Sequence, residues 1–144
     1  MKRQVFSLIS MLSLLLVAGS AVAQSNRVVA NVPFGFTVAN NSLPAGTYSV
    51  ETLSARDNRS LLLRGADDSS SMIISSIAAQ SHKPTAKTKL VFNRYGDQYF
   101  LSQIWVEGAT LGRELPKTSR EKEVAKAMAQ GPKPAQVEIV ASLN

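Results

Sequence analysis

Reactive side chains are few in this chain of 144 residues, which has one histidine, His82, and no cysteine. A Ser-His-Asp or Cys-His mechanism needs a histidine base, a nucleophile and a carboxylate that orients the base. No serine lies in a nucleophile-elbow pattern. One histidine also falls short of the three or four protein ligands of a usual zinc site. We therefore interpret His82 as a solvated loop residue and predict a protein that is not an enzyme and has no metal or cofactor.

Carboxylates are the remaining route to catalysis, because a pair of them hydrolyses glycosidic bonds in most glycosidases. Nothing in the spacing of the acids outside the acidic turns and the predicted helix selects a pair. These acids are Glu51, Asp97, Glu107, Glu114 and Glu138. A carboxylate-based hydrolase is therefore only the third hypothesis for this chain.

Three aromatic residues are candidate contacts for a ligand or a partner. Tyr95, Tyr99 and Trp105 lie on one predicted hairpin. Such rings bind sugars or apolar ligands in exported β domains. They alternate between the faces of their strands, however, and this favours core packing over one exposed platform.

Arg113 is the fourth candidate contact. It precedes the predicted helix, in a stretch whose pattern does not demand burial. Two interpretations stay open: an ion pair with the carboxylate of Asp97 or Glu107, or a solvated loop residue.

Apolar residues recur with period two through most of the chain, with turn residues between the runs, and this pattern indicates short antiparallel strands. We predict a mainly β fold, a single antiparallel β-barrel or β-sandwich of about seven or eight strands with one short C-terminal helix. The predicted strands are 27–32, 34–38, one within 43–53 after a turn at Pro44-Ala45-Gly46, 60–64, 72–78, two within 89–108, and 136–143.

The clearest hairpin turns at Gly96-Asp97, a recognised two-residue signal, although a three-residue loop centred on Gly96 fits nearly as well. Its second strand is apolar on both faces, which predicts a central strand or one beneath the helix, with Trp105 buried. The expected faces are Phe100, Ile104 and Val106 on one side and Tyr99, Leu101 and Trp105 on the other.

A capping box begins the predicted helix of about residues 119–130. The Thr118 hydroxyl can accept a hydrogen bond from the Glu121 amide, while the Glu121 side chain reaches back. Gly131-Pro132 then stops the helix. We expect the helix to dock on the sheet, because a short helix is unstable alone in water. Its inward stripe consists of Val124, Ala127 and Met128.

Residues 1–23 have the three-part pattern of a secretory signal peptide. Lys2 and Arg3 precede an apolar stretch at 5–18, and Ala21-Val22-Ala23 supplies the cleavage site. The stretch is shorter than the roughly 20 residues of a spanning helix, so an uncleaved anchor is the weaker alternative. We predict cleavage between Ala23 and Gln24, export to the periplasm or the extracellular space, and a single β domain at 24–144 with no stable membrane anchor.

Basic residues are in mild excess. Of 16 lysines and arginines the signal peptide holds two, which leaves 14 basic and 10 acidic residues, a net charge of +4. These residues are scattered, which argues against a nucleic-acid partner, but the excess favours weak attraction to anionic envelope polymers.

Three blocks of sequence resemble a family of short, exported bacterial proteins that are numerous in soil-dwelling Acidobacteria. They are VPFGFTVANNSLPAGTYSV at 32–50, LVFNRYGDQYFLSQIWVEG at 90–108 and GRELPKTSREKEVAK at 112–126. The resemblance implies a secreted β protein and brings with it no established activity, ligand or catalytic residue.

These observations favour an exported, non-enzymatic interaction or structural protein of the cell envelope or extracellular space. The edges of its sheets can add a strand from a partner, and an envelope protein or a polysaccharide is the expected kind of partner. The alternative is a small β-barrel that binds an apolar or glycan ligand, for which an enclosed apolar pocket would be evidence.

Overall fold

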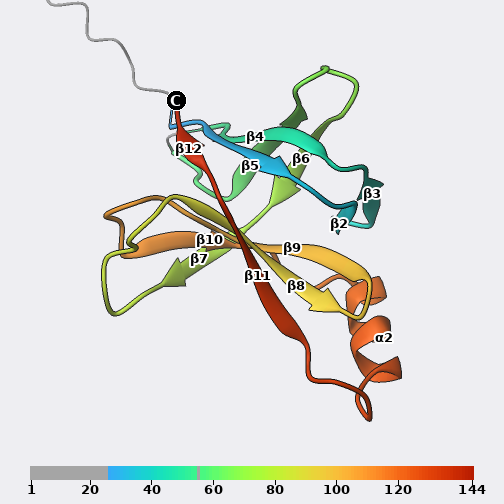
Figure 1. Ribbon diagram of the computed structural model, residues 1–144. Coiled ribbons are helices and arrows are strands. Elements are labelled where there is room, and N and C mark those ends of the chain that lie inside the picture. The colour runs from blue at the N-terminus through green and yellow to red at the C-terminus, as the bar shows by residue number, and fades with distance from the viewer. Residues whose placement is uncertain (1–25, 55) are drawn as a thin grey trace, which may run out of the picture.

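The computed structural model describes residues 26–54 and 56–144, so the predicted signal peptide and its cleavage site lie outside the described residues. Within those ranges, twelve strands and one helix form two facing sheets (Figure 1). The predicted mainly β fold with one helix near the C-terminus is confirmed. The two sheets do not close into a barrel, and the architecture is sandwich-like.

The first sheet is antiparallel throughout, in the order β12-β1-β4-β5-β6. Its strands show the expected alternation: in β1, Val28, Ala30 and Val32 are buried while Asn31 is exposed. The strands are β1 (Val28–Val32), β4 (Gly46–Thr52), β5 (Ser60–Gly65), β6 (Ser71–Ser75) and β12 (Ser142–Leu143).

The second sheet has the order β11-β8-β9-β10-β7, with the short β2–β3 pair attached. One edge of β9 is shared: β10 pairs with its C-terminal half, and β2 pairs with it in parallel at Phe100. The strands are β2 (Phe36–Val38), β3 (Asn41–Leu43), β7 (Ile77–Gln80), β8 (Lys89–Tyr95), β9 (Gln98–Trp105), β10 (Leu111–Glu114) and β11 (Ala135–Val140).

Two predicted strands cross from one sheet to the other, as strands at sandwich corners do. The chain leaves β6 at Ser76 and enters β7, and it leaves β11 at Ala141 and enters β12. The Ser76 amide and hydroxyl both donate to the carbonyl of Arg59, at 2.8 and 2.9 Å. Each crossing splits one predicted strand in two. With β3 and β10, these splits account for the larger number of strands.

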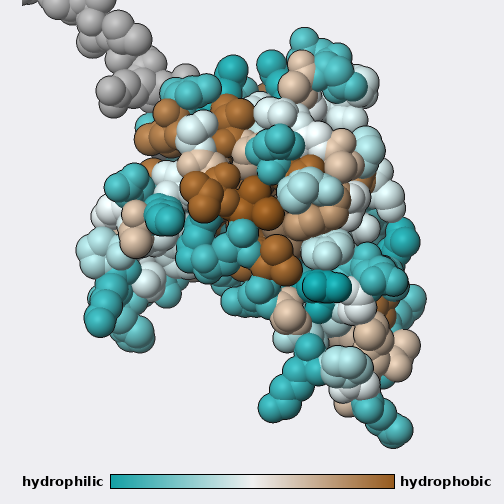
Figure 2. Space-filling model, viewed as in Figure 1, coloured by the Kyte–Doolittle hydropathy of each residue, from teal (hydrophilic) through white to brown (hydrophobic). Residues whose placement is uncertain are grey.

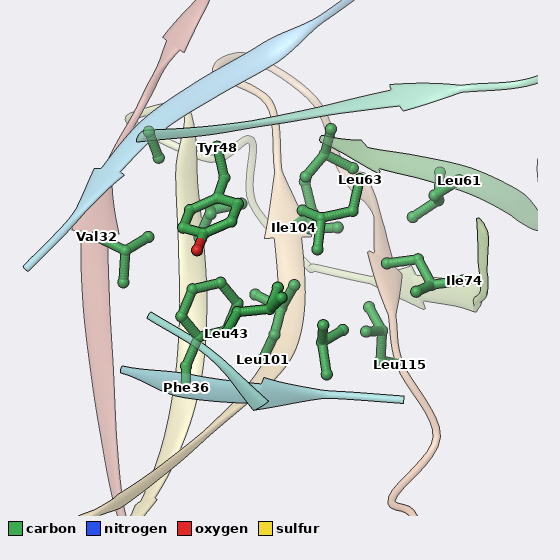
Figure 3. Close-up of a cluster of buried hydrophobic side chains, with 14 of the residues drawn as sticks. Val32, Phe36, Leu43, Tyr48, Leu61, Leu63, Ile74, Leu101, Ile104 and Leu115 are labelled. Atoms are coloured by element: carbon green, nitrogen blue, oxygen red, sulfur yellow. The ribbon is translucent and has the colours of Figure 1, made fainter. Parts of the chain in front are cut away.

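Side chains from both sheets fill the space between them (Figure 3). Val32, Tyr48 and Leu63 of the first sheet meet Phe36 and Leu101 of the second. Aromatic edge-to-face contacts join the layers, with the rings of Phe36 and Tyr48 5.0 Å apart between centroids. The centre of the sandwich is therefore occupied by the protein's own side chains.

A β-bulge at Ser102 changes the faces of β9. Val91 pairs with Gln103 and Phe92 with Leu101, so Ser102 has no opposite residue on β8. An extra residue reverses the alternation beyond it. Leu101 and Ile104 therefore share the core face. The expectation that they point to opposite faces is wrong for this reason.

The hairpin between β8 and β9 has the two-residue form. Tyr95 pairs with Gln98, which leaves Gly96-Asp97 as the loop. Gly96 has φ 61°, a conformation that glycine adopts at little cost.

Helix α2 (Ser119–Ala127) begins as predicted, because the Glu121 amide donates to the Thr118 hydroxyl at 3.2 Å. The rest of the predicted capping box is wrong. The Glu121 carboxylate turns to the second sheet, where its Oε1 accepts hydrogen bonds from Asn93 Nδ2 at 2.9 Å and the Tyr95 hydroxyl at 3.1 Å. Two donors on the sheet outweigh one backbone amide.

The helix ends at Ala127, three residues before the predicted end at residue 130. Gly131 has no positive φ and is not a left-handed cap. Val124 and Met128 are half-buried and Ala127 is exposed, while Glu121 is the buried residue of the helix. The helix therefore docks mainly through the hydrogen bonds of Glu121, and the prediction that an apolar stripe docks it is wrong.

Candidate functional site

The three candidate aromatic residues lie in three different environments. Tyr95 is buried beside α2, and Tyr99 stacks on Phe34 with 3.8 Å between ring centroids. Trp105 packs in a separate small cluster with Ala79 and Val91. The structure does not bring the rings together into one binding platform.

Tyr95, which contacts Glu121, has the most strongly shifted pKa among the described residues. Burial, the negative charge of Glu121 and the hydrogen bond to it raise the pKa of Tyr95 to about 12. Glu121 is itself only 4% exposed and is held by Asn93 as well. Through these two hydrogen bonds to Glu121, the network joins α2 to β8 of the second sheet.

Trp105 is only 8% exposed, as predicted. Its ring lies against Gly112 of β10, and its Nε1 donates to Gln103 Oε1 at 3.0 Å. The ring nitrogen is thus satisfied within the protein, and Trp105 is a packing residue of the outer face of the second sheet.

Arg113 occupies an unusual position, because it alternates along β10 with Gly112, which faces outward to Trp105. Its side chain therefore lies on the same face as the core residue Leu115. The guanidinium is held at the corner: Nε donates to Ser76 Oγ at 2.9 Å and Nη2 to the Ser76 carbonyl at 3.1 Å. Neither interpretation of Arg113 from the sequence describes this arrangement, since its partner is Ser76, at the crossing from β6 to β7.

Two hollows at one end of the sandwich share Arg113. The first, which we call the end groove, has a volume of about 420 Å³. The second, the basic pocket, measures about 780 Å³ and is lined by residues 56–60, 75–78 and Arg113. Asn58, Ala78 and Arg113 line both hollows, which therefore adjoin each other. The apolar walls of the end groove are Val28, Val50 and Leu61 of the first sheet, Ile104 and Leu111 of the second, and Val106, which directly follows β9.

A third hollow, the side groove, runs beside the outer edge of β6. It measures about 390 Å³ and lies between residues 73–75, the β2 residues with Ala39, and the segment 115–118 that leads to α2. Ile74 and Leu115 lie side by side at this flank of the core (Figure 3). Sequence reasoning missed this surface. The available signal was the stretch 71–80, SMIISSIAAQ, which has no charge, proline or glycine.

The remaining candidates for chemistry are dispersed. His82 is exposed in the loop after β7. Glu51 pairs with Arg27 at 3.2 Å and Glu138 with Lys89 at 2.6 Å. Within residues 26–54 and 56–144, no three histidine, cysteine, aspartate or glutamate side chains come close enough to hold a metal ion.

In the same part of the chain, no helix has both the length and the apolar character that a bilayer span requires. No protein-family model, no curated protein and no solved structure matches this chain.

Proposed function

We propose that this protein is an exported, non-enzymatic interaction protein that binds an extended segment of a partner protein by adding it as a strand to β6. The observation that carries the proposal is the free, uncharged edge of β6 beside the side groove. Strand addition of this kind draws its affinity from backbone hydrogen bonds and its specificity from pockets for alternate side chains.

The backbone of β6 offers hydrogen-bonding groups on its outer edge. The Ser76 amide donates a hydrogen bond to the carbonyl of Arg59, the residue before β5. Because the hydrogen-bonding direction alternates along an antiparallel strand, the backbone groups of Ile74 and Met72 also face β5. Ile73 and Ser75 consequently point theirs outward. Among the described residues β6 pairs with no second strand.

The side groove supports a partner of defined chemistry. In a strand added beside β6, every second side chain enters the side groove, which Val38, Ile74, Leu101 and Leu115 make apolar. The other side chains lie next to Ile73, which is 67% exposed. The partner is therefore an extended, uncharged segment with β-branched or other aliphatic residues at alternate positions.

The opposite flank of the sandwich is a weaker candidate. A hydrophobic surface lies there around β11, β12 and β1, where Val140 and Leu143 are exposed (Figure 2). Natural proteins protect sheet edges with charges and with short edge strands. β11 carries Glu138, which is paired with Lys89, and β12 has two residues. β6 and β7 have neither a charge nor a proline.

The test uses fluorescent ten-residue peptides in which threonine alternates with alanine, valine, leucine or phenylalanine. We expect saturable binding by fluorescence anisotropy, strongest for an aliphatic series, and slowed hydrogen exchange at the amides of Ile73 and Ser75. Binding without protection of these two amides would disprove strand addition at β6, and so would the absence of saturable binding by any of the four peptides.

Two proline variants form a matched pair. Ile73→Pro removes an amide that faces away from β5, and prolines are tolerated on such edges. Val140→Pro is the control: Val140 is 63% exposed, and its amide also faces outward because the next residue, Ala141, donates to Thr88 of the neighbouring segment. Ile73→Pro should weaken peptide binding at least tenfold and Val140→Pro should leave it unchanged. The reverse result would assign binding to the C-terminal flank and refute the proposal.

A further inference from the structure

We propose that the end groove and the basic pocket together bind a small anionic amphiphile, a molecule with one apolar chain and a carboxylate or phosphate head. The apolar chain lies in the end groove, and the head meets the guanidinium of Arg113. The basic pocket and the side groove share one lining residue, Ser75, but Arg113 and the apolar walls of the end groove do not line the side groove, so this proposal does not rest on the proposed function.

The position of Arg113 is the first argument. A charged side chain on the core face of a strand costs free energy unless it is paired. Ser76 satisfies two nitrogens of the guanidinium but supplies no negative charge. Ion pairs among the described residues join Arg27 to Glu51 and Lys89 to Glu138 and do not include Arg113. Arg113 is half-buried, and no carboxylate of the described residues pairs with its oriented positive charge.

The charge around Arg113 is the second argument. Arg56 and Arg59 line the basic pocket with it, and the single acid there, Asp57, accepts a hydrogen bond from the Arg59 amide at 2.9 Å. Glu51, the acid of the end groove, is engaged by Arg27. Three arginines against one aspartate favour an anion, and arginine is suited to carboxylate and phosphate groups because its planar donors match their oxygens.

The apolar walls are the third argument. Leu111 is 63% exposed on the rim of the end groove, and Ile104 and Leu61 lie deeper within it. Small-ligand sites typically have volumes of roughly 300–1,000 Å³, mostly apolar walls and a few convergent polar groups. Both hollows fall in this range, and Arg113 stands where the apolar wall meets the basic one. A ligand that uses both must be apolar at one end and anionic at the other.

The experiment titrates the protein, below micelle-forming concentrations, with decanoate, decyl phosphate and the neutral decyl glucoside, using isothermal titration calorimetry. Acetate and inorganic phosphate serve as heads without chains. We expect the two anionic amphiphiles to bind at least tenfold more tightly than the glucoside, with affinity falling as salt is added because the charge is screened. The tighter of the two identifies the head, fatty acid or phosphate ester. Equal binding of the glucoside, or no binding of either anion, would overturn the proposal.

Variants separate the two halves of the site. Arg113→Gln should lower the affinity for the anions at least tenfold and leave the glucoside unchanged, and Arg113→Lys should restore part of the loss. Leu111→Asp should weaken all three amphiphiles, whereas Val140→Asp, at an equally exposed residue on another strand, should weaken none. Anion binding that survives both Arg113→Gln and Leu111→Asp would place the ligand elsewhere and refute the site.

Peptide binding at β6 distinguishes a failure of the amphiphile site from a failure of the proposed function. Arg113→Gln should bind the alternating peptides like the unaltered protein, because Arg113 does not line the side groove. Substitution of Arg113 can disturb the crossing at Ser76, which its guanidinium holds. Leu111→Asp changes an exposed side chain and leaves that crossing intact, so it tests the ligand site independently.

Discussion

Of the glycines in the described residues, Gly112 leaves the least room for a Cβ atom, because the ring of Trp105 lies against it. A Cβ added to Gly112 would lie 2.6 Å from Trp105 Cε3, 2.7 Å from Trp105 Cδ2 and 2.9 Å from the carbonyl oxygen of Ile104. Carbon atoms in optimal contact are about 3.5–4.0 Å apart. The added methyl group is therefore about 1 Å too close to a ring that the cluster with Ala79 and Val91 holds in place.

Overpacking of this kind typically costs about 1–3 kcal/mol of stability, and we expect Gly112→Ala to lie in that range. Trp105→Ala alone should cost roughly 3–5 kcal/mol, because it removes a large buried side chain. The ring supplies two of the three close contacts, so its removal should relieve most of the strain. The double variant should lose less than the sum of the single losses, by about 0.5–3 kcal/mol.

Urea unfolding followed by far-ultraviolet circular dichroism measures these free energies, and the emission of Trp105 reports on the ring. In Gly112→Ala the emission should shift to the red as the ring is displaced. Gly131→Ala is the control, since its nearest atom is 3.4 Å away and its φ is not positive. It should change stability by less than about 0.5 kcal/mol. A fully stable Gly112→Ala, or strictly additive losses in the double variant, would refute this reasoning.

Three further predictions concern the hairpin, the helix contact and the N-terminus. The pKa of Tyr95 is about 12 when folded, against the ordinary 10.0, so between these values the unfolded state alone loses the proton. The free energy of unfolding should therefore be highest below pH 10 and fall as the pH rises toward 12. Tyr95→Phe should show a smaller fall over this interval in urea titrations, and an equal fall would contradict the Glu121 contact. Gly96→Ala should cost about 1–2 kcal/mol in the same assay, because φ 61° strains a residue with a Cβ; an unchanged midpoint would argue against the two-residue turn. N-terminal sequencing of the protein exported by its host should begin at Gln24, and a sequence beginning at Met1 would disprove cleavage.

Local interactions made much of the fold predictable from the sequence. Period-two alternation located β1 and β4, and the turns at Asp57-Asn58 and Asp67-Asp68-Ser69 located β5, each within two residues of its ends. The Gly96-Asp97 turn and the Thr118 cap were recognisable because each depends on residues that are neighbours in the chain. The burial of Trp105 also followed, since a strand that is apolar on both faces must be covered on both.

Contacts between distant segments escaped prediction. The bulge at Ser102 lies between Phe100, which pairs with β2, and Gln103, which pairs with β10, and the Ser102 carbonyl accepts a hydrogen bond from the distant Leu115 amide at 2.8 Å. The carboxylate of Glu121 accepts hydrogen bonds from Tyr95 and Asn93 of β8, 26 and 28 residues away, and not from the Thr118 amide at the start of its own helix. No local pattern encodes either choice.

The sequence by itself determined the strand-rich character of this protein, the start of its helix and the poverty of catalytic groups, because composition, alternation and capping are properties of neighbouring residues. Tertiary structure alone decided where the two proposed binding surfaces are located. The corner at Ser76 brings Arg113 from 37 residues away to the mouth of the sandwich, and the order of the strands leaves β6 at an edge. Both outcomes depend on which strands pair across the sheets, and pairing is a property of the whole folded chain.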